Sequence, residues 1–196
     1  STNTVVDTWK LPKGSDVVAQ SLALAPDGKR LYVGNLAGEG AAAWGLSTRT
    51  GKITRTVTTT YPGDPTMTLE VGALAVDPSG NYLYLGAMAG DVPKAGTYKV
   101  AIDDGRVMAK RLVNQNYLQA VGLAGNGRVV AMAGNSVSPA PGTLQVLKRK
   151  NLKPSQAKVT LPVSPMQLAT SESTSGVLRA HVTSVDDGAY WSIPIR

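Results

Sequence analysis

Short apolar segments alternate with clusters of glycine, proline and aspartate along the whole chain. Residues 22–25 are apolar, and Pro26, Asp27 and Gly28 precede a second apolar segment at 31–33. Such residues favour tight turns because they fix φ, bond to the local backbone or adopt positive φ. Short apolar segments separated by these turns are typical of β-hairpins, and no segment has a sustained helical period with caps. The pattern predicts an all-β protein with almost no helix.

The hairpin at residues 21–34 recurs along the chain. Copies of decreasing similarity lie at residues 72–86, 121–134 and 166–180. All four copies share a turn glycine: Gly28, Gly80, Gly127 and Gly176. These glycines are about 50 residues apart, which is the length of one four-stranded propeller blade. The repeat predicts a β-propeller of four four-stranded antiparallel blades.

The two ends of the chain complement each other in this scheme. We expect residues 1–196 to form a single propeller domain, with blades at approximately 12–61, 62–114, 115–161 and 162–196. Residues 4–11 resemble a fourth strand without its first three, and residues 189–195 form a third strand without a fourth. We expect the N-terminal strand to complete the last blade, which would cover two sheet edges that otherwise promote aggregation.

The first repeat also resembles a known family. Residues 25–34 read Ala-Pro-Asp-Gly-Lys-Arg-Leu-Tyr-Val-Gly, and residues 46–53 read Leu-Ser-Thr-Arg-Thr-Gly-Lys-Ile. Both strings resemble the bacterial YVTN β-propeller repeat, whose members include surface-layer and secreted binding proteins, lactonase-like enzymes and dehydrogenase subunits. Those wheels commonly have about seven blades, so four repeats fit either a small closed wheel or part of a larger one. The resemblance implies a bacterial, extracytoplasmic protein: periplasmic, secreted or at the cell surface.

Composition excludes several kinds of chemistry. Cysteine is absent and His181 is the only histidine, so thiol nucleophiles, thiolate zinc sites and multi-histidine metal sites are excluded. No apolar run reaches the roughly 18 residues of a membrane-spanning helix. The formal net charge of +7 favours acidic partners. We predict no metal, cofactor or catalytic residue.

Candidate binding residues lie in the loops that join the second strand of a blade to the third and one blade to the next. In propellers this loop end commonly meets ligands, a placement that comes from the fold and not from a sequence signal. The acidic and aromatic residues of these loops are Asp16, Glu39, Asp64, Glu70, Asp91, Tyr61 and Tyr117. They would form a rim for a sugar, a peptide or Ca²⁺, although solvated loop residues have the same composition and no calcium-loop motif supports a metal.

Other conspicuous residues are expected to be structural. Asp27 and Asp77 would bond to their own turns. His181 could act as a general base, but no serine in a nucleophile-elbow motif accompanies it. The basic run at 148–153 falls at a turn and lacks interleaved aromatic residues, so nucleic-acid binding is not predicted. The tryptophans, Trp9, Trp44 and Trp191, are expected to pack between blades.

Three functions remain open. The first is a non-catalytic binding or adhesion module that presents its loop end to a protein or glycan ligand. The second is a structural subunit, or the C-terminal part of a larger propeller that another chain completes. The third is a lactonase-like or dehydrogenase-subunit enzyme domain, which would need ionisable residues on the innermost strands.

Overall fold

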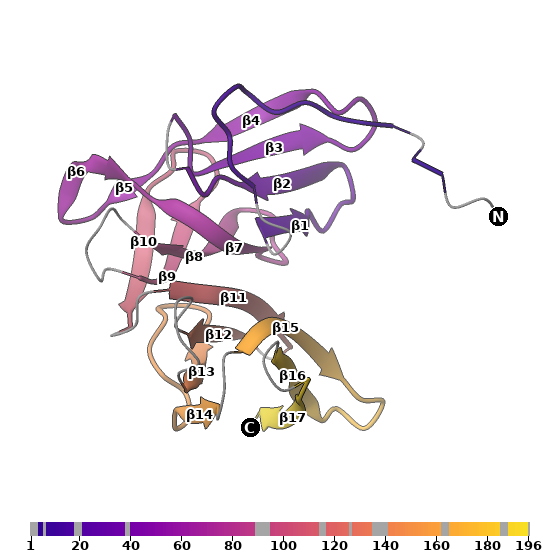
Figure 1. Ribbon diagram of the computed structural model, residues 1–196, viewed down its shortest axis with the longest axis vertical. Helices are drawn as coiled ribbons and strands as arrows, with labels where there is room; N and C mark the ends of the chain where they lie inside the picture. The colour runs from indigo at the N-terminus through magenta and orange to yellow at the C-terminus, as the bar shows by residue number, and fades with distance from the viewer. Residues whose placement is uncertain are drawn as a thin grey trace.

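The protein is built of stacked antiparallel sheets. The computed structural model describes residues 4–5, 7–17, 21–37, 40–88, 95–113, 117–125, 127–134, 141–161, 165–184 and 188–195. No α-helix occurs in these residues, and every pair of strands is antiparallel. In Figure 1 the first sheet lies at the top with the second below it, and the third and fourth sheets lie side by side in the lower half. The predicted all-β class is confirmed.

Each sheet is a meander in which consecutive strands are neighbours. The first sheet holds β1 (Leu22–Leu24), β2 (Arg30–Gly34), β3 (Ala43–Ser47) and β4 (Ile53–Val57), and the second holds β7 (Glu70–Val76), β8 (Tyr82–Met88), β9 (Gly96–Ala101) and β10 (Val107–Leu112). The third holds β11 (Tyr117–Ala124), β12 (Arg128–Gly134), β13 (Gly142–Lys148) and β14 (Val159–Leu161), and the fourth holds β15 (Pro165–Glu172), β16 (Leu178–Ser184) and β17 (Tyr190–Ile195). A hairpin that the sequence did not predict, β5 (Thr60–Tyr61) with β6 (Asp64–Thr68), lies between the first two sheets in the chain.

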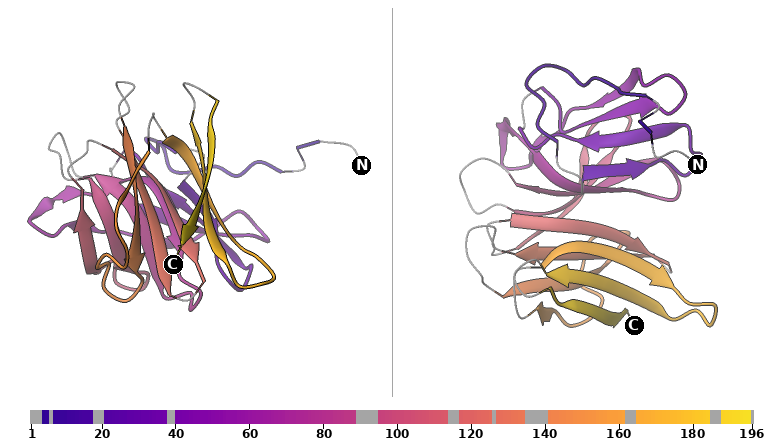
Figure 2. Two further views of the ribbon diagram at one scale, coloured as in Figure 1. Left: turned by 90° about the horizontal axis from the view of Figure 1, so that it is seen from below. Right: turned by 45° about the vertical axis from the view of Figure 1, so that its right-hand side comes forward.

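The first strands of the last three sheets share an irregularity. The register shifts between Val71 and Ala73 in β7, between Leu118 and Ala120 in β11, and between Pro165 and Gln167 in β15. A bulge increases the local twist of a strand. The repeated bulge therefore gives these three sheets a similar strong twist, and the twisted, edge-on sheets are visible in Figure 2.

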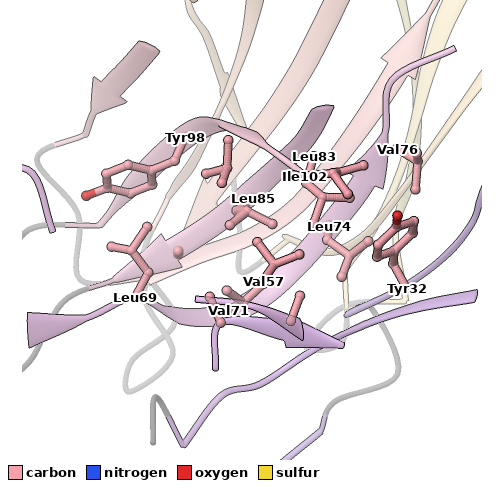
Figure 3. Close-up of a cluster of buried hydrophobic side chains, with 14 of the residues drawn as sticks. Tyr32, Val57, Leu69, Val71, Leu74, Val76, Leu83, Leu85, Tyr98 and Ile102 are labelled. Atoms are coloured by element: carbon pink, nitrogen blue, oxygen red, sulfur yellow. The ribbon is translucent and has the colours of Figure 1, made fainter. Parts of the chain in front are cut away.

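Apolar side chains fill each junction between successive sheets. Between the first and second sheets, Tyr32 and Val57 meet Leu74, Leu85 and Tyr98 (Figure 3). A second cluster, which includes Tyr84, Val129 and Leu152, joins the second sheet to the third. A third cluster, which includes Met132, Leu144 and Val182, joins the third sheet to the fourth. Burying one such side chain stabilises the fold by about 1.5–3 kcal/mol, so face-to-face stacking is the main source of stability.

The N-terminal segment does not complete the last sheet as predicted. Residues 4–5 and 7–17 contain no strand, and the fourth sheet has three strands among the described residues. Trp9 and Leu11 instead pack on the outer face of the first sheet, against a cluster that includes Trp44 and Leu46. That face is apolar, whereas the outer face of the fourth sheet carries Arg179, His181 and Thr183 beside the buried positions of β16. Covering the apolar face removes more apolar area from water, which explains why the prediction was wrong.

Candidate functional site

In the four stacked sheets, the turns between the first and second strands and between the third and fourth strands gather at one end of the stack, which we call the turn end (Figure 2, left). The sequence builds these turns as expected. Asp27 Oδ1 accepts a hydrogen bond of 3.0 Å from Lys29 N, and Gly28 has φ of 68°. Among the described residues, two crevices open at the turn end, one at each of the first two junctions between sheets.

The first crevice lies between the first and second sheets and has a volume of about 650 Å³. Arg55 Nε donates across the junction to the Ile102 carbonyl oxygen at 3.1 Å. Arg30 Nε donates to Thr54 Oγ1 at 3.2 Å. The exposed Arg106 side chain is paired with Asp104 at 3.6 Å. The charged residues of the lining are Arg30, Arg55, Asp103, Asp104 and Arg106, so cations and carboxylates are nearly balanced.

The second crevice lies between the second and third sheets and has a volume of about 550 Å³. Its inner wall is a polar network around Asp77, whose side chain is only 9% exposed. The Tyr84 hydroxyl lies 3.0 Å from Asp77 Oδ2 and 3.0 Å from the Arg149 carbonyl oxygen, and Arg149 Nε lies 3.5 Å from Asp77 Oδ2. Asp77 Oδ1 accepts from Ser79 N at 2.9 Å. The network fixes the β13–β14 turn to the second sheet.

These contacts set the charge of the inner wall. Burial raises the pKa of the Asp77 carboxyl, but hydrogen bonds from Ser79 and Tyr84, together with Arg149, outweigh it, and the pKa lies below its ordinary value. Burial and the neighbouring carboxylate raise the pKa of Tyr84 well above its ordinary range. At neutral pH Asp77 is therefore ionised and Tyr84 is a hydrogen-bond donor.

Lys99 is a further lining residue of this crevice. Its Nζ lies 4.1 Å from the centre of the Tyr82 ring and 5.8 Å from that of Tyr84. Burial lowers the pKa of Lys99, and Arg149 acts in the same direction while Asp77 opposes it. Lys99 makes no ion pair with any residue that the structure describes.

The sequence missed the role of Asp77 in this network. The bond from Asp77 N to the Tyr82 carbonyl oxygen matches the bond from Ala25 N to the Arg30 carbonyl oxygen, so Asp77 is the counterpart of Ala25 and not of Asp27. Its predicted turn role is confirmed by the bond from Ser79, but the Tyr84 and Arg149 contacts come in addition. The sequence did contain one signal of this role: Asp77 is a carboxylate at a position where the first repeat has apolar Ala25.

The predicted loop-end residues have varied surroundings. Tyr61 and Asp64 are register partners in the β5–β6 hairpin, where Asp64 Oδ1 accepts from Thr66 N at 3.0 Å and Lys110 Nζ lies 4.9 Å from the Tyr61 ring centre. Asp16 is exposed, and its carbonyl oxygen accepts from Leu36 N at 2.7 Å. Glu70 begins β7 opposite Met88, and the backbone of Tyr117 begins β11. Glu39 and Asp91 lie outside the described residues.

His181 has a serine partner that the sequence did not indicate. Ser171 Oγ lies 2.6 Å from His181 Nε2, and the Tyr190 hydroxyl lies 2.6 Å from His181 Nδ1. The three residues are brought together by cross-strand pairing on the outer face of the fourth sheet, and the histidine and tyrosine rings are stacked at 5.9 Å. Ser171 and Tyr190 are exposed, His181 is half-buried, and none of the three lines either crevice.

The basic run lies at the turn after β13, as predicted. In the described part of the chain, no helix is long and apolar enough to span a bilayer.

No protein-family model and no curated protein matches this chain. Solved structures do match it. The Dos1 propeller matches at 13% identity with a TM-score of 0.61, Saccharomyces cerevisiae Sqt1 at 11% with 0.63, and the WD40 repeats of RRP9 at 12% with 0.59. These matches cover 96%, 89% and 92% of this chain but 51%, 44% and 52% of those chains. The four sheets are thus arranged as in β-propellers, and the chain spans about half the length of the structures it matches.

Proposed function

We propose that this chain is a non-catalytic binding module that holds a partner protein at its turn end. The observation that carries the proposal is the pair of crevices between neighbouring sheets, lined by Arg30, Arg55, Tyr82 and Arg149. Arginine and tyrosine contribute most of the binding energy in many protein interfaces because they combine large contact area with directed hydrogen bonds.

Rigid turns support this choice of surface. The Arg55–Ile102 bond crosses the first junction, and the Tyr84–Arg149 bond crosses the second. A surface that is already fixed before binding loses little conformational entropy when a partner docks.

We further propose that the partner is met outside the cytoplasm, in an adhesion or surface-attachment role. The support is the similarity of residues 25–34 to the bacterial YVTN repeat, which occurs in surface-layer and secreted proteins. A glycan ligand, or a partner bound at the loop end through Asp16 and Tyr61, is the alternative.

Capture experiments with charge-reversed variants separate the two ends. The immobilised chain is incubated with a surface-protein extract of its source cells, and bound proteins are quantified by mass spectrometry. We expect the double variant Arg106→Glu, Lys150→Glu to lose the partners of the wild type, because both side chains are exposed at the turn end. Asp16→Lys, an exposed charge reversal outside the turn end, should retain them. The opposite result would place the partner at the loop end and contradict the proposal.

The second candidate function is that of a structural unit within a larger propeller. The inner strand β1 exposes Leu22 by 46% and Leu24 by 57%, and the matched propellers are about twice as long as this chain. Further blades, from a second chain or the same one, would cover these leucines. The solution mass of the chain tests this candidate.

A further inference from the structure

The second crevice carries an excess of positive charge that the first crevice lacks. Its lining contains five cationic residues and one carboxylate: Lys99, Arg128, Lys148, Arg149, Lys150 and Asp77. The remaining lining residues are Tyr82 and Gly127. Like charges repel one another more strongly in a partly enclosed site than in open water, so this arrangement costs free energy unless an anion is bound.

The one carboxylate cannot neutralise this lining. Asp77 is already engaged by Ser79, Tyr84 and Arg149. Lys99 lies over aromatic rings. No ion pair joins Lys99, Arg128, Lys148 or Lys150 to any described residue. Four cationic residues therefore surround the crevice without a carboxylate partner among the residues described.

The turn that supplies three of the cations has a strained backbone. Leu152 has φ of 56°, and Leu152 N donates to the Lys148 carbonyl oxygen at 2.8 Å. The equivalent turns of the first and second sheets use glycine at this position, with Gly51 N bonded to Ser47 O and Gly105 N bonded to Ala101 O.

A leucine in this conformation costs about 1–2 kcal/mol, which burial of its side chain at 1% exposure offsets. Leu152 packs in the cluster between the second and third sheets. The buried leucine therefore anchors the turn that presents Lys148, Arg149 and Lys150 at the mouth of the crevice.

We infer that the second crevice is a binding site for a phosphate-type dianion. A phosphate group carries a charge of about −1.5 to −2 at neutral pH and accepts hydrogen bonds through three or more oxygens. Arginine binds such oxygens with two parallel N–H groups, and lysine ammonium groups add point charges. Under the proposed function, the phosphate group belongs to a phosphorylated side chain of the partner protein. This choice of source rests on the proposed function.

Titration with inorganic phosphate at constant ionic strength tests the site itself, with binding followed by heteronuclear NMR of the whole chain. Lys99→Gln should weaken binding about tenfold or more, because it removes a charged donor from the crevice wall. Lys150→Gln, at an exposed position that does not contribute to the core, provides a second variant that should fold normally and weaken binding several-fold. Arg106→Gln removes the same charge from the first crevice and should leave binding within about twofold of the wild type.

Two outcomes would overturn the inference. One is the absence of saturable binding at phosphate concentrations up to about 20 mM. A dissociation constant above this concentration would be far weaker than that of a built phosphate site. The other is equal weakening by Lys150→Gln and Arg106→Gln, which would indicate attraction to the overall positive charge.

A phosphoserine peptide and its unphosphorylated form separate the two sources of the anion. Tighter binding of the phosphoserine peptide than of inorganic phosphate would support the site and a protein partner together. Binding of inorganic phosphate but not of the phosphoserine peptide would support an anion site that takes a small phosphorylated molecule. It would not support a phosphorylated partner protein. If neither binds, the inference fails, while the capture experiment with charge-reversed variants still decides the proposed function.

Discussion

The Tyr84 hydroxyl lies 3.0 Å from Asp77 Oδ2 and equally far from the carbonyl oxygen of Arg149. One side chain of β8 thus contacts a buried carboxylate of its own sheet and the backbone of the next sheet. Hydrophobic clusters hold the sheets face to face, and at the second junction the turn after β13 is held both by buried Leu152 and by this polar contact. Tyr84 therefore adds a directed contact between the two sheets, on which we expect the second crevice to depend.

Tyr84→Phe should destabilise the protein by about 1–3 kcal/mol. The substitution leaves the aromatic packing intact and removes the single hydroxyl proton that lies between two acceptors, Asp77 Oδ2 and the Arg149 carbonyl oxygen. Urea denaturation measures the effect. Tyr82→Phe is the matched control, because the Tyr82 hydroxyl makes no hydrogen bond to a described residue, and it should change stability by about 0.5 kcal/mol or less.

Asp77 should contribute to the acid sensitivity of the fold. Its pKa in the folded protein lies below the ordinary value of 3.8. The stabilisation is therefore fully present above that ordinary value and is lost as the pH falls through the folded-state pKa. Thermal midpoints measured from about pH 2 to pH 6 should fall less steeply in Asp77→Asn than in the wild type. Asp27→Asn, which affects only a turn bond to Lys29, should keep the wild-type slope; an unchanged slope in Asp77→Asn would refute the role of the network.

Two turn glycines should differ in their tolerance of alanine. Gly105 has φ of 71°, and a Cβ at this position would collide with the Thr58 carbonyl oxygen. Gly80 has φ of 74°, and no atom lies within 4 Å of the place that a Cβ of residue 80 would take. Gly80→Ala should cost about 1–2 kcal/mol from backbone conformation alone. Gly105→Ala must in addition move the backbone at the first junction, so its thermal midpoint should be clearly lower; equal midpoints would contradict this packing.

The exposed leucines of β1 should promote association of the isolated chain. Burial of Leu22 and Leu24 in a contact between molecules would remove apolar area from water. Light scattering after size exclusion should show a mass that rises with concentration, and Leu22→Ser, Leu24→Ser should suppress the rise. A concentration-independent monomer in both proteins would argue against the larger propeller.

Much of the fold could be predicted from short-range sequence patterns. The hairpins around Gly28 and Gly80 are encoded by adjacent residues, and the apolar segment at 31–33 lies within β2. The position of the N-terminal segment could not be predicted in this way. Its apolar residues alternate as in a strand, and only the stacked structure reveals that the face containing Trp44 is apolar and the outer face of the fourth sheet is polar.

The candidate site depended on longer-range information. Asp77, Lys99 and Arg149 are far apart in the sequence, and each has an ordinary local explanation: a turn, a strand surface and a solvated basic run. Stacking of the second sheet on the third brings them to one crevice. The seven loop-end residues remain a prediction, since their proximity to a ligand is a property of the fold class and not of the residues themselves.

Hydrogen-exchange footprinting of the chain with its captured partner tests directly whether a partner protein binds at the turn end. We expect slower exchange on binding in the turns at 77–82, 101–106 and 148–153, which border the two crevices. Exchange in the β5–β6 hairpin, which borders neither crevice, should be unchanged. Protection of β5–β6 and of residues near Asp16, with unchanged exchange in the three turns, would contradict the claim and assign binding to the opposite end.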